Sequence, residues 1–127
     1  MPENSAEIMG AYSPGLRVDL GDSEMIFVTG QMSMDAGGNV VCPGDIAGQT
    51  ERVFQNIDNI LRGAGATMND VVKAQIFLTD IGNFSIVSPI RNKYFAIAKP
   101  VSTMVQVVAL SKPGCDIEIE VIAIKQK

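Results

Sequence analysis

Residues Lys99–Gln126 decide the fold of this chain; they read Lys-Pro-Val-Ser-Thr-Met-Val-Gln-Val-Val-Ala-Leu, Ser-Lys-Pro-Gly, then Cys-Asp-Ile-Glu-Ile-Glu-Val-Ile-Ala-Ile-Lys-Gln. Apolar residues alternate along both halves, with a turn sequence between them, which predicts two strands that close as a hairpin. Side chains alternate across a strand, so the second strand has a continuously apolar face and a mixed face. These faces are Ile117, Ile119, Val121 and Ala123, and Glu118, Glu120, Ile122 and Ile124. We expect both to be at least half buried.

The composition is that of one globular domain spanning residues 1–127. Hydrophobic residues make up 46% and charged residues 19% of the chain. No apolar run is long enough to cross a bilayer, so no membrane partner is indicated, and the first residues lack the parts of a signal peptide. We therefore expect a cytoplasmic protein with free thiols at Cys42 and Cys115, and a loose segment at residues 1–10.

Charge and residue content exclude several kinds of function. The net charge is -4 and the basic residues are scattered, which argues against a nucleic-acid partner. The chain has no histidine, and so lacks the commonest general base and metal ligand. Any catalysis must therefore use carboxylates, hydroxyls, backbone groups or water, and no metal or organic cofactor is indicated.

The order of the expected elements predicts an α+β fold, with two helices on one side of a mixed sheet. The elements are a hairpin of Leu16–Leu20 and Met25–Thr29, a short strand at Val40–Val41, a helix from Asp45 to about Leu61, a strand Val71–Thr79, a helix Phe84–Ala98 and the closing hairpin. Two helices cover only one face of a sheet. The other face would carry Met104, Val108, Leu110, Ile122 and Ile124, which indicates burial against copies of the same chain.

The two helices are predicted from apolar residues that recur every three or four positions. The first has the stripe Ile46, Thr50, Val53, Phe54, Ile57, Ile60 and Leu61, with Asp45 or Gly44 to cap its start and Gly63 or Gly65 to end it. The second has Ile86, Val87, Ile90, Tyr94, Phe95 and Ile97 on its buried side. Pro89 is unfavourable inside a helix, so this helix either starts near Ser88 or has an irregular first turn.

Several motifs occur in the order found in a known family. They are Tyr12-Ser13, Val28-Thr-Gly-Gln31, Gln49-Thr-Glu-Arg-Val-Phe-Gln-Asn-Ile57, Asp70-Val-Val-Lys73, Phe77-Leu-Thr-Asp80, and Pro100 followed by Ile117-Glu-Ile-Glu-Val-Ile-Ala123. Over nearly its whole length the chain resembles the Rid family, the reactive intermediate imine/enamine deaminases, also described as L-PSP endoribonucleases. The resemblance implies a chorismate-mutase-like (RidA-like) domain. It also implies a homotrimer, with an inner barrel of sheets and a small-molecule cleft between each pair of subunits.

The resemblance further implies which residues line the cleft. The family's deaminases have a tyrosine, a small hydroxyl residue before Gly-Gln and a glutamate in the last strand. These positions fall on Tyr12, Thr29 and Glu118, with Gly30 beside Thr29. In this reading Glu118 activates a water molecule for attack on a C=N bond, and Tyr12 and Thr29 hold the substrate. Burial is expected to raise the pKa of Glu118 and so suit it to this role.

Three other cleft positions differ from the family pattern. The family's asparagine falls on Ser88, its arginine on Ser102 and its cysteine on Met104. The arginine is understood to bind the substrate carboxylate, and losing such a charge-assisted pair costs about 2–5 kcal/mol in a desolvated site. Ordinary 2-imino acids are therefore poor candidate substrates.

Three functions remain open from the sequence. The first is an imine or enamine deaminase whose substrate lacks an α-carboxylate or carries its acid elsewhere. The second is a small-molecule-binding trimer that has lost the chemistry. The third and least favoured is an endoribonuclease, because the chain has neither histidine nor a basic surface for RNA.

Overall fold

The structure, a computed structural model, describes residues 14–127. The expected loose segment at residues 1–10, and Tyr12, lie outside the described residues. The strands are β1 Gly15–Asp19, β2 Ser23–Met32, β3 Val71–Leu78, β4 Val101–Gln106 and β5 Ile117–Gln126. The helices are α1 Ile46–Gly63 and α2 Phe84–Tyr94, and short 3-10 helices at Met68–Asp70 and Ile81–Asn83 precede β3 and α2.

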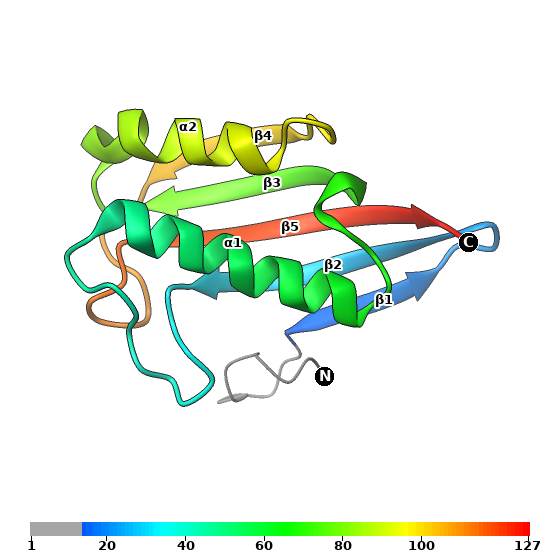
Figure 1. The fold of residues 1–127 in the computed structure, drawn as a ribbon, viewed down its shortest axis with the longest axis horizontal. Coiled ribbons are helices and arrows are strands. Elements are labelled where there is room, and N and C mark those ends of the chain that lie inside the picture. Colours follow the sequence, from blue (N-terminus) through cyan, green and yellow to red (C-terminus); the bar gives the residue numbers. More distant parts are fainter. Residues whose placement is uncertain (1–13) are drawn as a thin grey trace.

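The strands form one five-stranded sheet in the order β1-β2-β5-β3-β4. Both helices lie on the same face of this sheet (Figure 1). Neighbouring strands are antiparallel except β3 and β4, which are parallel and are connected through α2. The predicted α+β fold, with a mixed sheet and two helices on one face, is confirmed.

The core lies between the helices and the sheet. The predicted stripe of α1 is confirmed, since Val53, Phe54, Ile57 and Leu61 are fully buried. Asp45 caps this helix by accepting a hydrogen bond from the backbone N–H of Gly48. The predicted apolar face of β5 is confirmed too. Its residues Ile117, Ile119, Val121 and Ala123 are at most 2% exposed.

The start of α2 is regular despite its proline, but its end differs from the prediction. The helix begins at Phe84, directly after a 3-10 turn, and contains Pro89, so a start near Ser88 is wrong. It ends at Tyr94 rather than Ala98. Ile97 lies beyond this end and is 75% exposed, because helical periodicity no longer governs its direction. Ile86 is also exposed, whereas Val87 and Phe95 are buried.

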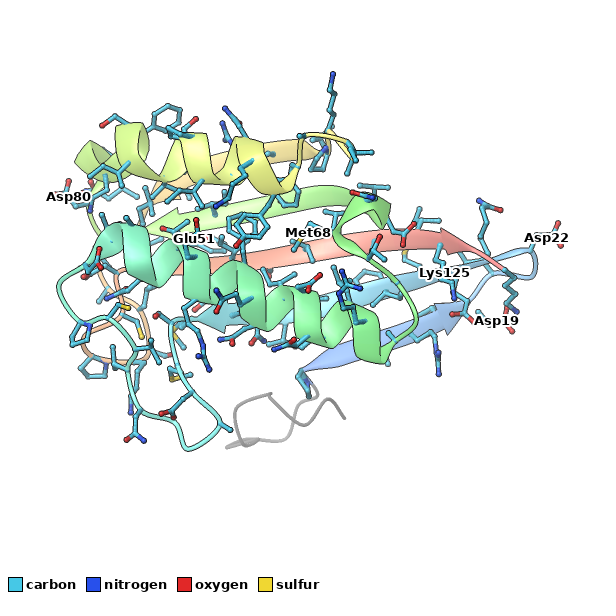
Figure 2. The ribbon with its side chains drawn as sticks, in the orientation of Figure 1. Asp19, Asp22, Glu51, Met68, Asp80 and Lys125 are labelled. Carbon is cyan, nitrogen blue, oxygen red and sulfur yellow. The ribbon has the colours of Figure 1, made fainter. Side chains whose placement is uncertain are left out.

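Aromatic rings and one carboxylate hold the two helices together. The Phe54 ring stacks on Tyr94 at a centroid distance of 4.4 Å and meets the edge of Phe95. Glu51, on the side of α1 that faces α2 (Figure 2), accepts hydrogen bonds from the Tyr94 hydroxyl and from Lys93. Burial and the Glu51 carboxylate raise the pKa of Tyr94 to about 12. The charge of Lys93 is thus used within the fold.

The expected closing hairpin is wrong. β5 lies between β2 and β3, and β4 pairs with the far side of β3. β4 also ends at Gln106, so Val108 and Leu110 lie in the connection to β5 rather than in a strand. A strand with two apolar faces is stabilised most when it has neighbours on both edges, and β5 fits that central place better than β4.

The residues predicted for the open face are only partly right. Paired residues share a face of a sheet, and Met104 pairs with the buried Ile76. Met104 therefore lies on the helix-covered face and packs against the core. Ile122 pairs with Phe27 and Lys73 on the open face. Its other large apolar residues include Leu16, Val18 and Val101.

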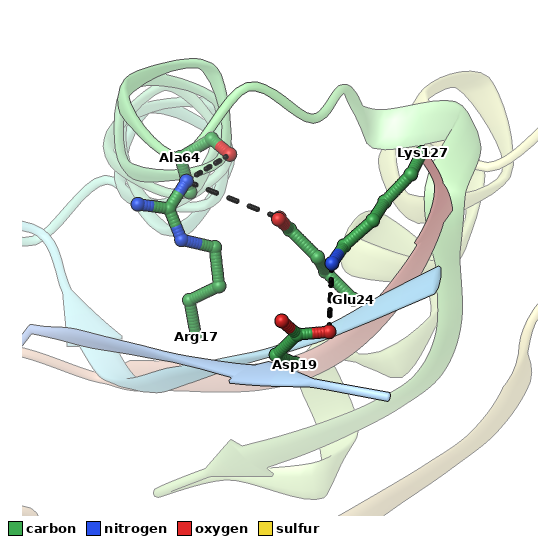
Figure 3. Close-up of polar contacts among 5 residues, drawn as sticks. All are labelled: Arg17, Asp19, Glu24, Ala64 and Lys127. Carbon is green, nitrogen blue, oxygen red and sulfur yellow. Dashed lines mark hydrogen bonds and ion pairs between the residues drawn. The ribbon is translucent and has the colours of Figure 1, made fainter. Parts of the chain in front are cut away.

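The β1–β2 hairpin is joined to both ends of the fold by polar contacts (Figure 3). Arg17 donates to the Ala64 carbonyl just after α1 and lies 3.9 Å from the Glu24 carboxylate. Lys127, at the end of the chain, pairs with Asp19 at 2.7 Å. These groups are largely exposed, so each contact adds little free energy.

The remaining observations concern short or isolated features. The expected strand at Val40–Val41 is a single bridge between Met34 and Val40. Cys42 and Cys115 are free, as predicted. Among residues 14–127, no helix is long and apolar enough to cross a membrane, and no group of three potential metal ligands is found.

Candidate functional site

Glu118 lies at the point where β2 departs from regular pairing. The register between β2 and β5 shifts between Val28 and Gln31, so Thr29 and Gly30 form a bulge. Beyond the bulge Glu118 pairs with Met32 on one side and with Phe77 of β3 on the other. Bulges redirect side chains locally, and this one brings backbone against the glutamate.

Gly30 allows the Glu118 carboxylate to approach the backbone closely. A Cβ atom at position 30 would lie 2.3 Å from Oε2 of Glu118 and 2.9 Å from its Cδ. Real Cβ atoms do not tolerate such distances, so any larger residue would displace the carboxylate. The structure therefore gathers three of the predicted site residues, Thr29, Gly30 and Glu118, at one place.

The electrostatic setting of Glu118 favours its protonated form. Desolvation by burial raises the pKa of its carboxyl group, and the negative charge of Glu120, two residues on, raises it further. Among the described residues, the Glu118 carboxylate has no hydrogen-bond donor or ion-pair partner, unlike that of Glu51. A half-buried, unpaired carboxylate is a candidate general base.

A hollow in the open sheet face lies close to this site. Its volume is about 240 Å³ and its lining includes Thr29, Lys73, Gln75 and Glu120, together with Phe27 and Ile122. One amine, one amide and one carboxylate thus surround an apolar floor. Such a mixture of apolar surface and a few polar groups is typical of small-ligand sites.

Ser102 lies elsewhere, in a pocket between the end of α2 and the start of β4. This pocket has a volume of about 420 Å³ and is lined by Arg91, Asn92, Phe95, Ala96, Lys99, Pro100 and Ser102. Ser102 pairs with the buried Ala74, which places it on the helix-covered face of the sheet. Within one chain, Ser102 and Glu118 therefore lie on opposite faces.

Ser88 belongs with the second pocket rather than with Glu118. Its hydroxyl accepts a hydrogen bond from Nη2 of Arg91 at 2.9 Å, one turn further along α2. Met104 follows Ser102 on the same face of β4. The predicted substrate-binding residues thus divide into Gly30 beside Glu118 and the trio Ser88, Ser102 and Met104 on the α2 side.

A family model described as endoribonuclease L-PSP matches residues 3–125. The chain belongs to the endoribonuclease L-PSP family. This membership confirms the Rid-like resemblance in the sequence. The matched range covers every strand and helix of the sheet and both pockets.

Relatives of this L-PSP-family chain are similar along most of their length. A RutC family protein of Pyrococcus abyssi is 38% identical over 98% of this chain and 94% of its own. The 2-iminobutanoate/2-iminopropanoate deaminase of Bos taurus is 37% identical over 92% of this chain and 82% of its own. The structure of E. coli TdcF with bound serine has a TM-score of 0.81 at 29% identity, covering 96% and 94% of the two chains.

Arg91 and Lys99 are site residues that the sequence analysis missed. Ser88 and Arg91 are three residues apart, so they occupy one face of a helix, and that spacing could have revealed their contact. Lys99 stood only as the end of a helix in the sequence. Its backbone has a φ of +48°, which no local sequence signal indicated.

Replacing Gly30 by alanine should displace the Glu118 carboxylate without unfolding the protein. The clash falls on the end of a flexible side chain, which can rotate away. We expect a lower pKa for Glu118 in Gly30→Ala, because the displaced carboxylate regains water. Carboxyl-carbon NMR titration measures this pKa, with Gly37→Ala in the exposed loop as the control. An unchanged Glu118 pKa would show that Gly30 does not control this carboxylate.

Replacing Glu118 by glutamine should stabilise the protein near neutral pH. The pKa of Glu118 is raised above its ordinary value of 4.5, so ionisation costs free energy only in the folded state. This cost is absent well below pH 4.5 and complete above the raised pKa. The melting temperature of Glu118→Gln should therefore exceed that of the native chain at neutral pH. The difference should shrink in acid, and Asp22→Asn should show no such pattern.

Proposed function

We propose that the protein is a hydrolytic deaminase of a small imine or enamine other than the ordinary 2-imino acids, in which Glu118 activates the attacking water. One observation carries the proposal. The Glu118 carboxylate is half-buried, lies against Gly30, and has no partner among the described residues. A carboxyl group whose pKa is raised toward neutrality accepts a proton from water more readily than an ordinary one.

The proposed reaction balances with this single proton carrier. Glu118 takes a proton from water as the water oxygen bonds to the imine carbon, and the C=N π electrons move to nitrogen. The protonated Glu118 then returns this proton to nitrogen. Loss of the carbinolamine hydroxyl proton lets the carbonyl form as the C–N bond breaks and ammonia leaves. The net change is one water consumed and one ammonia released, with Thr29 and Tyr12 proposed to hold the substrate.

Among the relatives, the Bos taurus protein bears the name of a deaminase of two small imino acids. The related TdcF structure contains serine, which shows that a protein of this fold holds a small polar compound. Both support a small-molecule function for this chain. The absence of histidine in this sequence makes an endoribonuclease the weaker proposal.

We further propose a homotrimer in the cytoplasm, with the site in a cleft between subunits. The open sheet face exposes Leu16 and Val101 at 59% and 70%, and Phe27 at 38%. Apolar residues gathered on one uncovered face favour burial against another copy. Because Glu118 and Ser102 lie on opposite faces of one sheet, a cleft that contains both needs two subunits.

Light scattering should therefore give three times the chain mass of 13.6 kDa. The exposed apolar residues of the open face supply the physical reason. Phe27→Glu should shift the distribution toward smaller species, whereas Ile97→Glu, outside the sheet, should not. A stable native monomer would remove the proposed cleft.

The native protein should not measurably accelerate hydrolysis of 2-iminopropanoate or 2-iminobutanoate generated by an amino-acid oxidase. Position 102 offers a serine hydroxyl where a guanidinium would place the substrate carboxylate, and lost placement lowers kcat/KM. Ser102→Arg should restore part of the rate, because Ser88 and Met104 still differ from the deaminase pattern. Ammonia release measures the rate, and Ser111→Arg, outside the pocket, is the matched control.

Two outcomes of this assay would change the proposal. A fast native rate that Ser102→Arg does not raise would show that another group places the carboxylate. If neither native nor variant protein hydrolyses any of a panel of small imines, with or without an acid group, a non-catalytic small-molecule-binding trimer becomes the better description.

A further inference from the structure

The α2–β4 pocket carries two positive charges and no negative one. Its lining includes Arg91 and Lys99 but no aspartate or glutamate. In the part of the chain from residue 14 onward, neither cation forms an ion pair with a carboxylate. Lys93, on the same helix, is by contrast paired with Glu51. Two uncompensated charges in one concave site attract an anion.

Arg91 is held in place by neighbours on its own helix. Nε donates to Asn92 at 3.3 Å, Nη2 donates to Ser88 at 2.9 Å, and the guanidinium lies 6.0 Å from the centre of the Phe84 ring. A guanidinium has five N–H donors, so three remain for a ligand among the described contacts. A positioned planar donor loses little entropy when it binds a carboxylate.

Lys99 reaches the same pocket from a strained backbone. Its φ of +48° lies in the left-handed region that glycine adopts more easily. Its N–H donates to the Phe95 carbonyl at 2.9 Å, which closes the chain between α2 and β4. Strained residues of this kind persist mainly where they serve a function. A lysine here, rather than glycine, adds an amine to the pocket at the expense of local strain.

The other lining residues favour an organic acid over a bare inorganic anion. Phe95, Ala96 and Pro100 give the pocket an apolar wall beside its two cations. The C-terminal end of α2 contributes a negative potential equal to about half a charge, which two full positive charges outweigh. The Ser102 hydroxyl supplies a further donor.

We infer that this pocket binds the carboxylate of a small organic acid through Arg91 and Lys99. The guanidinium holds the two carboxylate oxygens, the amine adds charge, and the hydrocarbon part lies against Phe95 and Pro100. Binding here goes beyond the proposed hydrolysis, since it requires no reaction. Only the further step, that the acid belongs to the substrate of Glu118, rests on the proposed function.

Calorimetric titration of the full-length protein with butyrate at low ionic strength tests the inference. Butyramide is the matched probe, because it has the same shape without the charge. Butyrate should bind and butyramide should not, and added salt should weaken butyrate binding. Inorganic phosphate is the third probe, and we expect it to bind more weakly than butyrate because it gains nothing from the apolar wall.

Three variants locate the binding. Arg91→Gln should weaken butyrate binding by about tenfold or more, the range for losing a hydrogen bond to a charged group. Lys93→Gln removes the same charge from the same helix, but from a residue already paired with Glu51, and should leave the affinity unchanged. Lys99→Gly should weaken binding while the melting temperature holds or rises, because glycine relieves the backbone strain.

The inference is overturned if butyrate and butyramide bind equally, if butyrate does not bind, or if Arg91→Gln and Lys93→Gln behave alike. Phosphate binding tighter than butyrate would overturn the assignment to an organic acid. Circular dichroism checks that each variant is folded, and Lys99→Gly keeps the test decisive if Arg91→Gln does not fold. Butyrate binding by a protein without imine hydrolysis would support this inference and count against the proposed function alone.

Discussion

The fold and the candidate site both depend on the central position of β5. This strand pairs with β2 on one edge and β3 on the other, and one of its faces is fully buried under α1. Pairing on both edges leaves Glu118 few ways to reach water, because its open face is shared with Phe77 and Met32. The burial that stabilises the strand therefore also raises the pKa of its glutamate. Stability and candidate chemistry have one physical origin here.

The sheet separates two kinds of chemistry. A half-buried carboxylate lies on the open face, and a pocket with two cations lies on the face covered by α2. A sheet is one layer thick but impassable to side chains, so one chain cannot bring Glu118 and Arg91 to the same ligand. In the proposed trimer the open face of one subunit meets a neighbour, and the edge strand β4 is the element that a neighbour can reach. The distribution of charge thus gives oligomerisation a functional reason as well as an apolar one.

Helix α2 divides its residues between packing and binding. Tyr94 and Lys93 meet Glu51 and fasten the helix to α1, while Arg91 lies beside Ser88 and faces the pocket. The difference between two basic residues only two positions apart is whether a carboxylate is within reach. A charge neutralised inside the fold contributes to stability, and a charge left without a partner at a concave surface is available to a ligand.

The sequence by itself determined which faces of the main elements are buried. The alternation in Ile117–Ala123 and the stripe of α1 are periodic, and periodicity decides a face without knowledge of any partner. It also indicated Glu118 as a carboxylate on a half-buried face. The tertiary structure decided which strands are neighbours, so that the expected hairpin of β4 and β5 was wrong and Met104 lay on the helix-covered face. It also decided that Gly30 meets Glu118 and that Arg91 and Lys99 share a pocket. These relations depend on contacts between distant segments, and alternation along one strand carries no information about what lies beside it.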